Sequence, residues 1–435
     1  MYTYPNVKPT PEQAQWSDCE IGVLIHMDLQ TFMPYNFRDH FGKNPPSSVF
    51  NPTMLDTDQW METAAAAGAK YAVLVAKHCS GFSLWPTAAH PFSIQNSPWK
   101  QGQGDIVGDF IASCKKYGIR PGLYYSLACN SYLRVDNPGR VVGGTAEEQQ
   151  AYNAIALRQL EELWTNYGKL FEIWFDGGCL PEEEGGPAVI PLLHKLQPDA
   201  VVFQGPPGTK SLIRWVGNED GEAPEDCWST TSAQGDTYNG EENFYIPGSP
   251  AGELWAPAES DTPIRHWKTA YCSGWFWKDG EDHLVHSPEY LLDRYYKSVG
   301  RNSNLLIGMV IDNRGLVPDA DAAVFQEFGR LLSKQFSTPA ASASGKGNTL
   351  ILDLQKAMPV RDVVLMEEIL EGQRVLSFTV EGLAETGWQP LASGKSIGHK
   401  RIIPIAAVSP FSKIRLTCQE AKDTPIIREL SVYTK

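Results

Sequence analysis

Short apolar runs alternate with amphipathic segments along the first 335 residues. Several of these runs are nearly continuous in hydrophobic residues, which is typical of strands in a parallel sheet covered on both faces. "IGVLIHM" and "KYAVLVAKH" are the clearest examples. The pattern predicts strands at 21–27, 70–78, 119–127, 170–177, 200–205, 213–219, 270–277 and 304–310.

Helical patterns fill the intervals between these runs. The segment 104–118 ends in Lys-Lys-Tyr-Gly, a basic last turn followed by a glycine stop. The segment 145–168 begins at Thr145, an N-cap residue, with glutamates in its first turn. Further helices are predicted at 56–69, 187–196, 287–300 and 320–335.

Eight strands alternating with helices predict a (β/α)₈ barrel with insertions. The connection between the fifth and sixth strands leaves room for at most a small helix. A doubly wound open sheet is the alternative. It is disfavoured because neither G-x-G-x-x-G nor a phosphate-binding loop follows the first strand.

The composition changes after Gln335. "STPAASASGKGN" (337–348) is rich in small and polar residues and is predicted to be a linker. Short strand-like runs separated by turn residues follow, at the spacing of a β-sandwich. We therefore expect a barrel domain at 1–336 and a β-sandwich at 349–435 that either braces the barrel or binds glycan.

Composition and charge narrow the classes of function. The formal net charge of −14 argues against a nucleic-acid partner and against anionic membrane surfaces. We expect no membrane insertion, since no apolar run is long enough to span a bilayer. The start, "MYTYPNVKPT", lacks the features of a signal peptide, so we expect an intracellular protein or one whose leader has been removed. The eight scattered cysteines are expected to be reduced and mostly buried.

Polar and aromatic side chains gather where the predicted strands end, the position of catalytic groups in barrel enzymes. Asp176 closes the apolar run "FEIWFDGG", directly after Trp174 and Phe175, and Glu219 follows the sixth strand. Two carboxylates in an aromatic pocket predict glycoside hydrolysis, in which one attacks the anomeric carbon and the other protonates the leaving oxygen. Other candidates at strand ends are His26, His78, Tyr125, Trp275 and Trp277.

Each candidate also has a purely structural interpretation. An aspartate before two glycines is often a turn residue. Glu219 lies in the acidic loop "GNEDGEAPED", where most charges are simply solvated. A histidine at a strand end is often a core or rim residue, and tryptophans fill cores as readily as they stack on sugars. Their joint placement at strand ends is what favours a catalytic site.

Several motifs resemble the α-L-fucosidases of glycoside hydrolase family 29. The similarity runs in order through nearly the whole first domain, and "WFDGG" after the long helix is its most specific element. The segment "RWVGNEDGEA" resembles the subgroup that prefers α-1,3/1,4-linked fucose on branched glycans. The matching segments are "EIGVLIHMDLQTF", "FNPTMLDTDQW", "YAVLVAKHCSGFSLWPT", "GDIVGDFIASCKKYGIRPGLYYS", "LWTNYGKLFEIWFDGG", "RWVGNEDGEA" and "SVGRNSNLLIGMV".

This resemblance implies a retaining barrel enzyme with a C-terminal β-sandwich, no cofactor and no metal, acting on a fucosylated oligosaccharide or glycoconjugate. It implies that Asp176 is the nucleophile and Glu219 the acid/base. Sugar-binding roles are implied for His26, His78, Trp174 and an aromatic residue on the seventh strand, Trp275 or Trp277.

The chain departs from the family pattern at two places. It has "HCSGF" where the family usually has His-His-Asp-Gly-Phe, so Cys79 stands in place of a second sugar-binding histidine and Ser80 in place of an acid. The loop after the first strand carries His40 and Phe41 where the family tends to carry Glu-Trp. A buried sugar hydroxyl that loses its partner costs about 1–3 kcal/mol. The sugar is therefore either altered or held by other groups such as His40.

Three alternatives follow. The first is a related α-L-glycosidase, for an α-L-galactoside or a substituted fucoside. The second is a protein that binds glycans without cleaving them. The third is a metal-dependent barrel hydrolase, which is disfavoured because the first strand carries His26 without an H-x-H pair.

Overall fold

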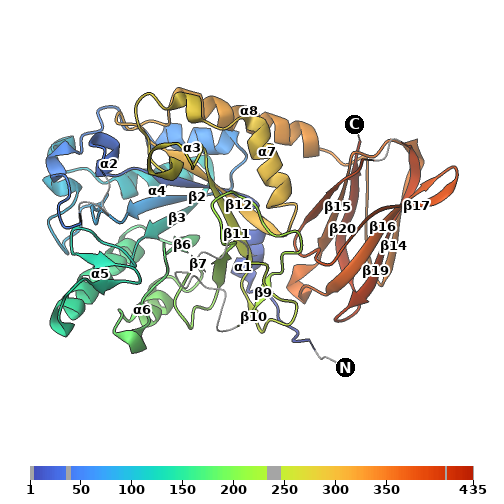
Figure 1. Ribbon diagram of the computed structural model, residues 1–435, viewed down its shortest axis with the longest axis horizontal. Coiled ribbons are helices and arrows are strands. Elements are labelled where there is room, and N and C mark those ends of the chain that lie inside the picture. Colours follow the sequence, from blue (N-terminus) through green and yellow to red (C-terminus); the bar gives the residue numbers. More distant parts are fainter. Residues whose placement is uncertain (1–3, 36–40, 233–245, 407–408, 435) are drawn as a thin grey trace.

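The computed structural model describes residues 4–35, 41–232, 246–406 and 409–434. Eight parallel strands close into a barrel in the order β1-β12-β11-β8-β7-β6-β3-β2, and helices surround it (Figure 1). This confirms the predicted (β/α)₈ barrel. The barrel strands are β1 Ile21–His26, β2 Tyr71–Lys77, β3 Arg120–Tyr125, β6 Glu172–Trp174, β7 Val201–Phe203, β8 Leu212–Trp215, β11 Ala258–Pro263 and β12 Ser303–Val310.

Two of the predicted helix ends carry the caps that the sequence indicates. Thr145 caps α5 through a reciprocal hydrogen-bonded box with Glu148. Gly118 ends α4 in the left-handed conformation, with φ +67°. As expected, no helix lies between β7 and β8, which only residues 204–211 separate. The α-helices are α1 Pro11–Ser17, α2 Leu29–Phe32, α3 Thr57–Ala66, α4 Ile106–Tyr117, α5 Ala146–Asn166, α6 Val189–Leu196, α7 Pro288–Lys297 and α8 Asp319–Phe336.

Smaller elements lie in the connections. Two small two-stranded antiparallel sheets, β4 with β5 and β9 with β10, lie outside the barrel sheet. No described helix is both long and apolar enough to cross a membrane. The remaining elements are β4 Val135–Asp136, β5 Arg140–Val141, β9 Thr230–Thr231, β10 Leu254–Trp255 and the 3₁₀ turns η1 Ser47–Val49, η2 Ile94–Asn96, η3 Trp99–Gly102, η4 Glu182–Glu184, η5 Tyr271–Gly274, η6 Asp282–Leu284 and η7 Ile369–Glu371.

The prediction of the seventh strand was wrong. The strand is β11, "AESDTP", and the predicted segment 270–277 contains instead the short turn η5. The polar composition of β11 is typical of a loop, yet every one of its residues is buried. Its acidic side chains Glu259 and Asp261 accept hydrogen bonds inside the barrel, which makes a polar strand tolerable there.

Two buried glutamates form a polar layer in the barrel interior. Trp16 from α1 donates its indole N–H to Glu172 at 3.1 Å, while the Tyr71 hydroxyl and the Trp174 indole donate to Glu259 at 2.6 and 2.9 Å. Burial and the neighbouring carboxylate of Glu259 raise the pKa of Glu172 well above its ordinary value, and burial raises the pKa of Glu259 to about 7. The pair therefore holds at least one proton at neutral pH.

The C-terminal domain is a sandwich of two antiparallel four-stranded sheets, β13-β20-β15-β18 and β14-β19-β16-β17, at the right of Figure 1. The segment predicted as a linker contains β13, which pairs with β20, so the sandwich begins inside that segment. The strands are β13 Ala341–Lys346, β14 Thr349–Met358, β15 Asp362–Glu367, β16 Val375–Ala384, β17 Gly387–Gly394, β18 Arg401–Pro404, β19 Phe411–Ala421 and β20 Ile426–Tyr433.

The sandwich is attached to the barrel by polar contacts as well as by apolar packing. The backbone N–H of His399 donates to Asn302 at 2.7 Å, and Arg401 pairs with Glu225 at 2.8 Å. Ile402, beside them on β18, packs into the barrel's hydrophobic core. A tightly held interface of this kind fits the bracing role considered for this domain.

Gly22 on β1 permits a close contact that holds the barrel together. A Cβ at this position would lie 2.3 Å from the ring of Tyr71, which is fully buried and bonded to Glu259. Gly22→Ala is therefore expected to lower the free energy of unfolding by about 1–3 kcal/mol, measured by chemical denaturation. The control is Gly345→Ala on β13, where the contact, at 2.9 Å, is a flexible Leu350 methyl; an equal loss in both variants would contradict the argument.

Candidate active site

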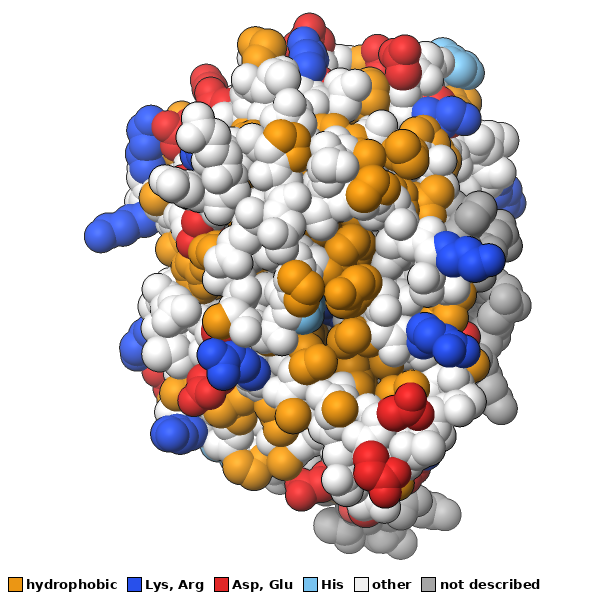
Figure 2. Space-filling model, turned by 90° about the vertical axis from the view of Figure 1, so that its left-hand side faces the viewer, with side chains coloured by type: hydrophobic (Ala, Val, Ile, Leu, Met, Phe, Trp, Pro, Cys, Tyr) orange, Lys and Arg blue, Asp and Glu red, His pale blue; other side chains and the backbone are white. Residues whose placement is uncertain are grey.

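A cavity of about 580 Å³ opens at the C-terminal ends of the barrel strands. Figure 2 shows this face, with apolar side chains gathered around a central hollow. Three carboxyl groups and many rings line the cavity. The lining residues are Leu24, His26, Gln30, Tyr35, His78, Cys79, Tyr124, Trp174, Asp176, Gly177, Phe203, Gln204, Trp215, Glu219, Asp261, Tyr271, Cys272, Ser273, Trp275 and Phe276.

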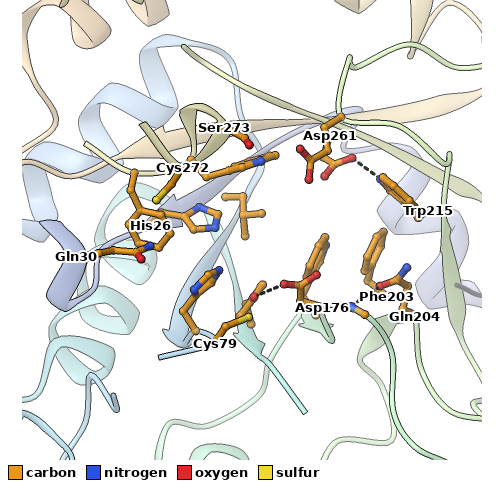
Figure 3. A pocket seen from close by; sticks show the side chains of 18 of the residues that line it. His26, Gln30, Cys79, Asp176, Phe203, Gln204, Trp215, Asp261, Cys272 and Ser273 are labelled. Atoms are coloured by element: carbon orange, nitrogen blue, oxygen red, sulfur yellow. Dashed lines mark hydrogen bonds between the residues drawn. The ribbon is translucent and has the colours of Figure 1, made fainter. Parts of the chain in front are cut away.

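Asp176 stands at the cavity wall two residues beyond the end of β6. Gly177 and Gly178 both adopt left-handed φ values, of 70° and 76°, so the chain turns sharply as soon as the carboxylate has been presented. The Tyr124 hydroxyl donates a short hydrogen bond of 2.6 Å to Asp176 Oδ2 (Figure 3). The amide of Gln204 accepts from the backbone N–H of Gly177 at 3.1 Å and so fixes the turn.

Glu219 and Asp261 bring two more carboxyl groups to the same cavity. Glu219 follows β8, and Asp261 lies on β11, where it accepts the indole N–H of Trp215 at 2.6 Å (Figure 3). Burial and the negative charge of Glu219 raise the pKa of Asp261 well above its ordinary value. Asp261 therefore keeps its proton to a higher pH than an ordinary aspartate does.

Stacked rings build the rest of the wall. Trp174 lies between Phe203, at 4.0 Å between ring centroids, and Tyr124, at 5.2 Å, and both pairs are nearly parallel. The ring of His26 packs against those of Trp275 and Phe276, with 5.1 Å between ring centroids in both pairs. Such surfaces suit the apolar faces of a sugar ring.

His26 is poised as a neutral hydrogen-bonding group. Burial lowers its pKa to about 3, so the imidazole stays uncharged at physiological pH. Its Nδ1 atom is buried and has no hydrogen-bond partner in the described part of the chain. A sugar hydroxyl is a natural partner for such an atom, because a buried polar atom without a bond is costly.

The structure brings most of the predicted site residues together. His26, His78, Cys79, Trp174 and Trp275 line the cavity with the two predicted catalytic carboxylates. Tyr125, Trp277 and Phe41 are not among the lining residues, and His40 lies outside the described residues.

Tyr125 lies on the opposite side of its strand from the cavity. Its hydroxyl donates to Gln159 of α5 at 2.7 Å, in the layer between strands and helices. Because side chains alternate along a strand, the preceding residue, Tyr124, faces the cavity instead. The run around β3 is apolar on both faces, so hydrophobicity alone does not distinguish these two tyrosines.

The sequence interpretation also missed Asp261, Gln30 and Trp215. Asp261 was not considered because the strand that carries it, β11, was not predicted. The side-chain amide of Gln30 is buried beside the cavity, and neither its oxygen nor its nitrogen has a hydrogen-bond partner among the described residues. Trp215 belongs to a predicted strand, and its inward position follows from the pairing of β8 with β11.

The sequence matches a known enzyme family. A profile of the alpha-L-fucosidase family matches residues 1–336, and "Alpha-L-fucosidase 1" of Arabidopsis thaliana is 32% identical over 98% of this chain and 87% of its own. The chain belongs to the alpha-L-fucosidase family. A rice relative, "Putative alpha-L-fucosidase 1", is 34% identical over 98% of this chain and 85% of its own.

Solved structures of the alpha-L-fucosidase family share the whole architecture. A putative alpha-L-fucosidase from Bacteroides thetaiotaomicron is 35% identical, with a TM-score of 0.92 over 99% of this chain and 100% of that one. A glycoside hydrolase 29 family member from a rumen bacterium is 30% identical, with a TM-score of 0.83 over 99% of this chain and 78% of its own. The family, the hydrolase class and the two-domain architecture expected from the sequence are thereby confirmed.

Proposed function

We propose that this alpha-L-fucosidase is a retaining, exo-acting enzyme in which Asp176 is the nucleophile and Glu219 the acid/base. The observation that carries the proposal is the Asp176 carboxylate, held by the Tyr124 hydroxyl on the wall of a cavity that Glu219 also lines. Both carboxyl groups stand at the C-terminal end of the barrel, where such enzymes carry out their chemistry.

The reaction proceeds in two steps. Asp176 attacks the anomeric carbon of fucose, the bond to the leaving oxygen breaks, and Glu219 donates a proton to that oxygen. Glu219 then takes a proton from water, whose oxygen attacks the anomeric carbon and releases Asp176. Two inversions give net retention, and fucose leaves as the free sugar.

The surrounding residues hold the sugar. Neutral His26 and the neighbouring His78 offer ring nitrogens to sugar hydroxyls, and Trp275 offers an apolar face to the methyl group of fucose. Trp174 braces the wall through its stack with Tyr124 and its bond to Glu259. The floor of the site is thus tied to the buried acid layer of the barrel.

The proposed substrate is terminal α-1,3- or α-1,4-linked L-fucose on a branched glycan. Support comes from the segment "RWVGNEDGEA", which carries Trp215 and Glu219 to the cavity. The test is release of free L-fucose from a branched oligosaccharide and from a linear α-1,2-linked one. Preference for the branched substrate by about tenfold or more, roughly 1.4 kcal/mol in the transition state, is expected; preference for the linear one would overturn the assignment.

An α-L-galactoside is the second candidate substrate, because Gln30 offers a buried amide beside the cavity that has no hydrogen-bond partner among the described residues. α-L-Galactose carries a hydroxymethyl group where fucose carries a methyl group, and an amide is a suitable partner for the additional hydroxyl. Matched aryl α-L-fucosides and α-L-galactosides distinguish the two. If the galactoside is favoured and Gln30→Met removes that preference, the second candidate replaces the first.

Tyr124→Phe is expected to lower kcat by about 10- to 150-fold, since a hydrogen bond to a charged group is worth about 1.5–3 kcal/mol. Loss of the donor also raises the pKa of Asp176, so the acidic limb of the kcat/KM profile moves to higher pH. The control is Tyr125→Phe, whose hydroxyl bonds Gln159 behind the strand. An equal loss in both variants would contradict the role given to Tyr124.

A further inference from the structure

Three donor side chains of different chemistry converge in the cavity. His78 and Cys79 directly follow β2, and Asp176 follows β6, with β3 between these two strands. One ligand atom from each of the three lies within 4.8 Å of the other two. Cys79 and Asp176 come from different strands and lie near each other on the lower wall of the cavity in Figure 3.

This donor set matches the preferences of a zinc-class ion. A histidine nitrogen, a cysteine sulfur and a carboxylate oxygen are its usual protein ligands, at about 2.0–2.3 Å from the ion. Tetrahedral ligands at these distances lie about 3.5 Å apart, so the three side chains need to approach one another by an ångström or so. The fourth position would open to the cavity and to solvent.

The neighbours of the three residues already orient them, as the outer shell of a metal site does. The Tyr124 hydroxyl fixes one oxygen of Asp176, and the imidazole of His78 is stacked on the Tyr124 ring, with 5.8 Å between centroids. The hydroxyl of Ser126 lies 3.7 Å from the sulfur of Cys79. The arrangement therefore requires little reorganisation to receive an ion.

One nearby charge opposes a cation. The buried ammonium of Lys77 donates to the backbone carbonyls of Ser126 and Cys129, close to Cys79. Its positive charge would weaken the binding of a cation. The site is accordingly expected to bind reversibly rather than permanently.

We propose that His78, Cys79 and Asp176 form a binding site for a zinc-class divalent cation, and that occupancy switches the enzyme off by engaging the nucleophile. The ion would be an inhibitor and not a cofactor. The binding half of this proposal needs only the geometry. The inhibition half rests on the proposed role of Asp176.

Binding is tested by titrating Zn²⁺ into the metal-free protein in a phosphine-reduced buffer, followed by calorimetry. One ion per chain is expected, and Cys79→Ser should weaken binding by roughly tenfold or more, the scale of losses when a zinc site is disturbed. The matched control is Cys114→Ser, which removes a buried thiol packed against Met61 outside the cavity and should leave binding unchanged. Equal affinity in Cys79→Ser and the unaltered protein would overturn the proposal.

Cobalt gives a second readout that does not depend on activity. Co²⁺ bound by a thiolate absorbs in the near ultraviolet through sulfur-to-metal charge transfer, and this band should be present in the unaltered protein and absent in Cys79→Ser. If Cys79→Ser does not fold, Cys79→Ala is used for the same comparison. A band that persists without Cys79 would place the ion elsewhere and refute the assignment.

Inhibition is measured separately as fucose release with and without Zn²⁺, each variant compared with its own metal-free rate. Inhibition that a chelator reverses, and that Cys79→Ser resists, is expected. Equal inhibition of both proteins would refute the switch. If the metal-free protein releases no fucose, the proposed function is contradicted. Calorimetry and the cobalt band still decide whether the metal binds, because neither depends on activity.

Discussion

Asp176→Asn is expected to lower the rate of fucose release by about a thousandfold or more, the scale seen when a nucleophile is removed. Asparagine keeps the shape and can still accept from the Tyr124 hydroxyl, but its amide does not attack the anomeric carbon. Free L-fucose released from a branched fucosylated oligosaccharide is the measurement. Calorimetric binding of the same oligosaccharide should survive the change.

The matched control is Asp199→Asn, an exposed carboxylate paired with Lys169 far from the cavity. It should release fucose at the unaltered rate. If Asp176→Asn keeps its activity, the nucleophile is another group. If the unaltered, folded protein binds the oligosaccharide without releasing fucose, the chain is a glycan-binding protein and the catalytic assignment is lost.

Glu219→Gln is expected to lower fucose release from glycans by about 10²- to 10⁴-fold, the usual contribution of general acid–base catalysis. Its signature is dependence on the leaving group. Aryl fucosides with acidic phenols leave without protonation, so the first step on them should be much less affected. Paired kinetics on a glycan and on an activated aryl fucoside measure the difference.

Two neighbouring carboxylates make this test specific. Glu222, three residues further on, pairs with Arg294 and Arg301, so Glu222→Gln should not show the leaving-group pattern. Asp261 shares the cavity with Glu219. A leaving-group-dependent loss in Asp261→Asn but not in Glu219→Gln would transfer the acid/base role to Asp261.

Hydrophobic runs were sufficient to predict seven of the eight barrel strands, because buried parallel strands need apolar side chains on both faces. β11 was not predicted because its inward positions carry Glu259 and Asp261. Their burial is tolerated because side chains of other barrel strands donate hydrogen bonds to them. Those partners cannot be read from local sequence. The segment 270–277 was mistaken for a strand because it is rich in aromatic residues. Several of these rings line the cavity and do not belong to a buried sheet.

The candidate site was predictable where a polar residue broke an apolar run. Asp176 stood out in this way, and His26 and His78 ended strands. The choice between Tyr124 and Tyr125 depends on the direction of the strand's alternation, which a strand apolar on both faces does not reveal. Phe41 and Trp277 belong to connecting segments whose path the sequence pattern does not specify.

The buried pair Glu172 and Glu259 has a thermodynamic consequence for the whole molecule. The folded-state pKa of Glu259, about 7, lies above its ordinary value of 4.5, and that of Glu172 is raised as well, so the folded chain binds more protons than the unfolded chain in this window. Stability contributed by these acids is greatest below pH 4.5 and declines as the pH rises toward 7. Folding this barrel at neutral pH is thus coupled to proton uptake, and the proton is held in the barrel interior beneath the proposed sugar site.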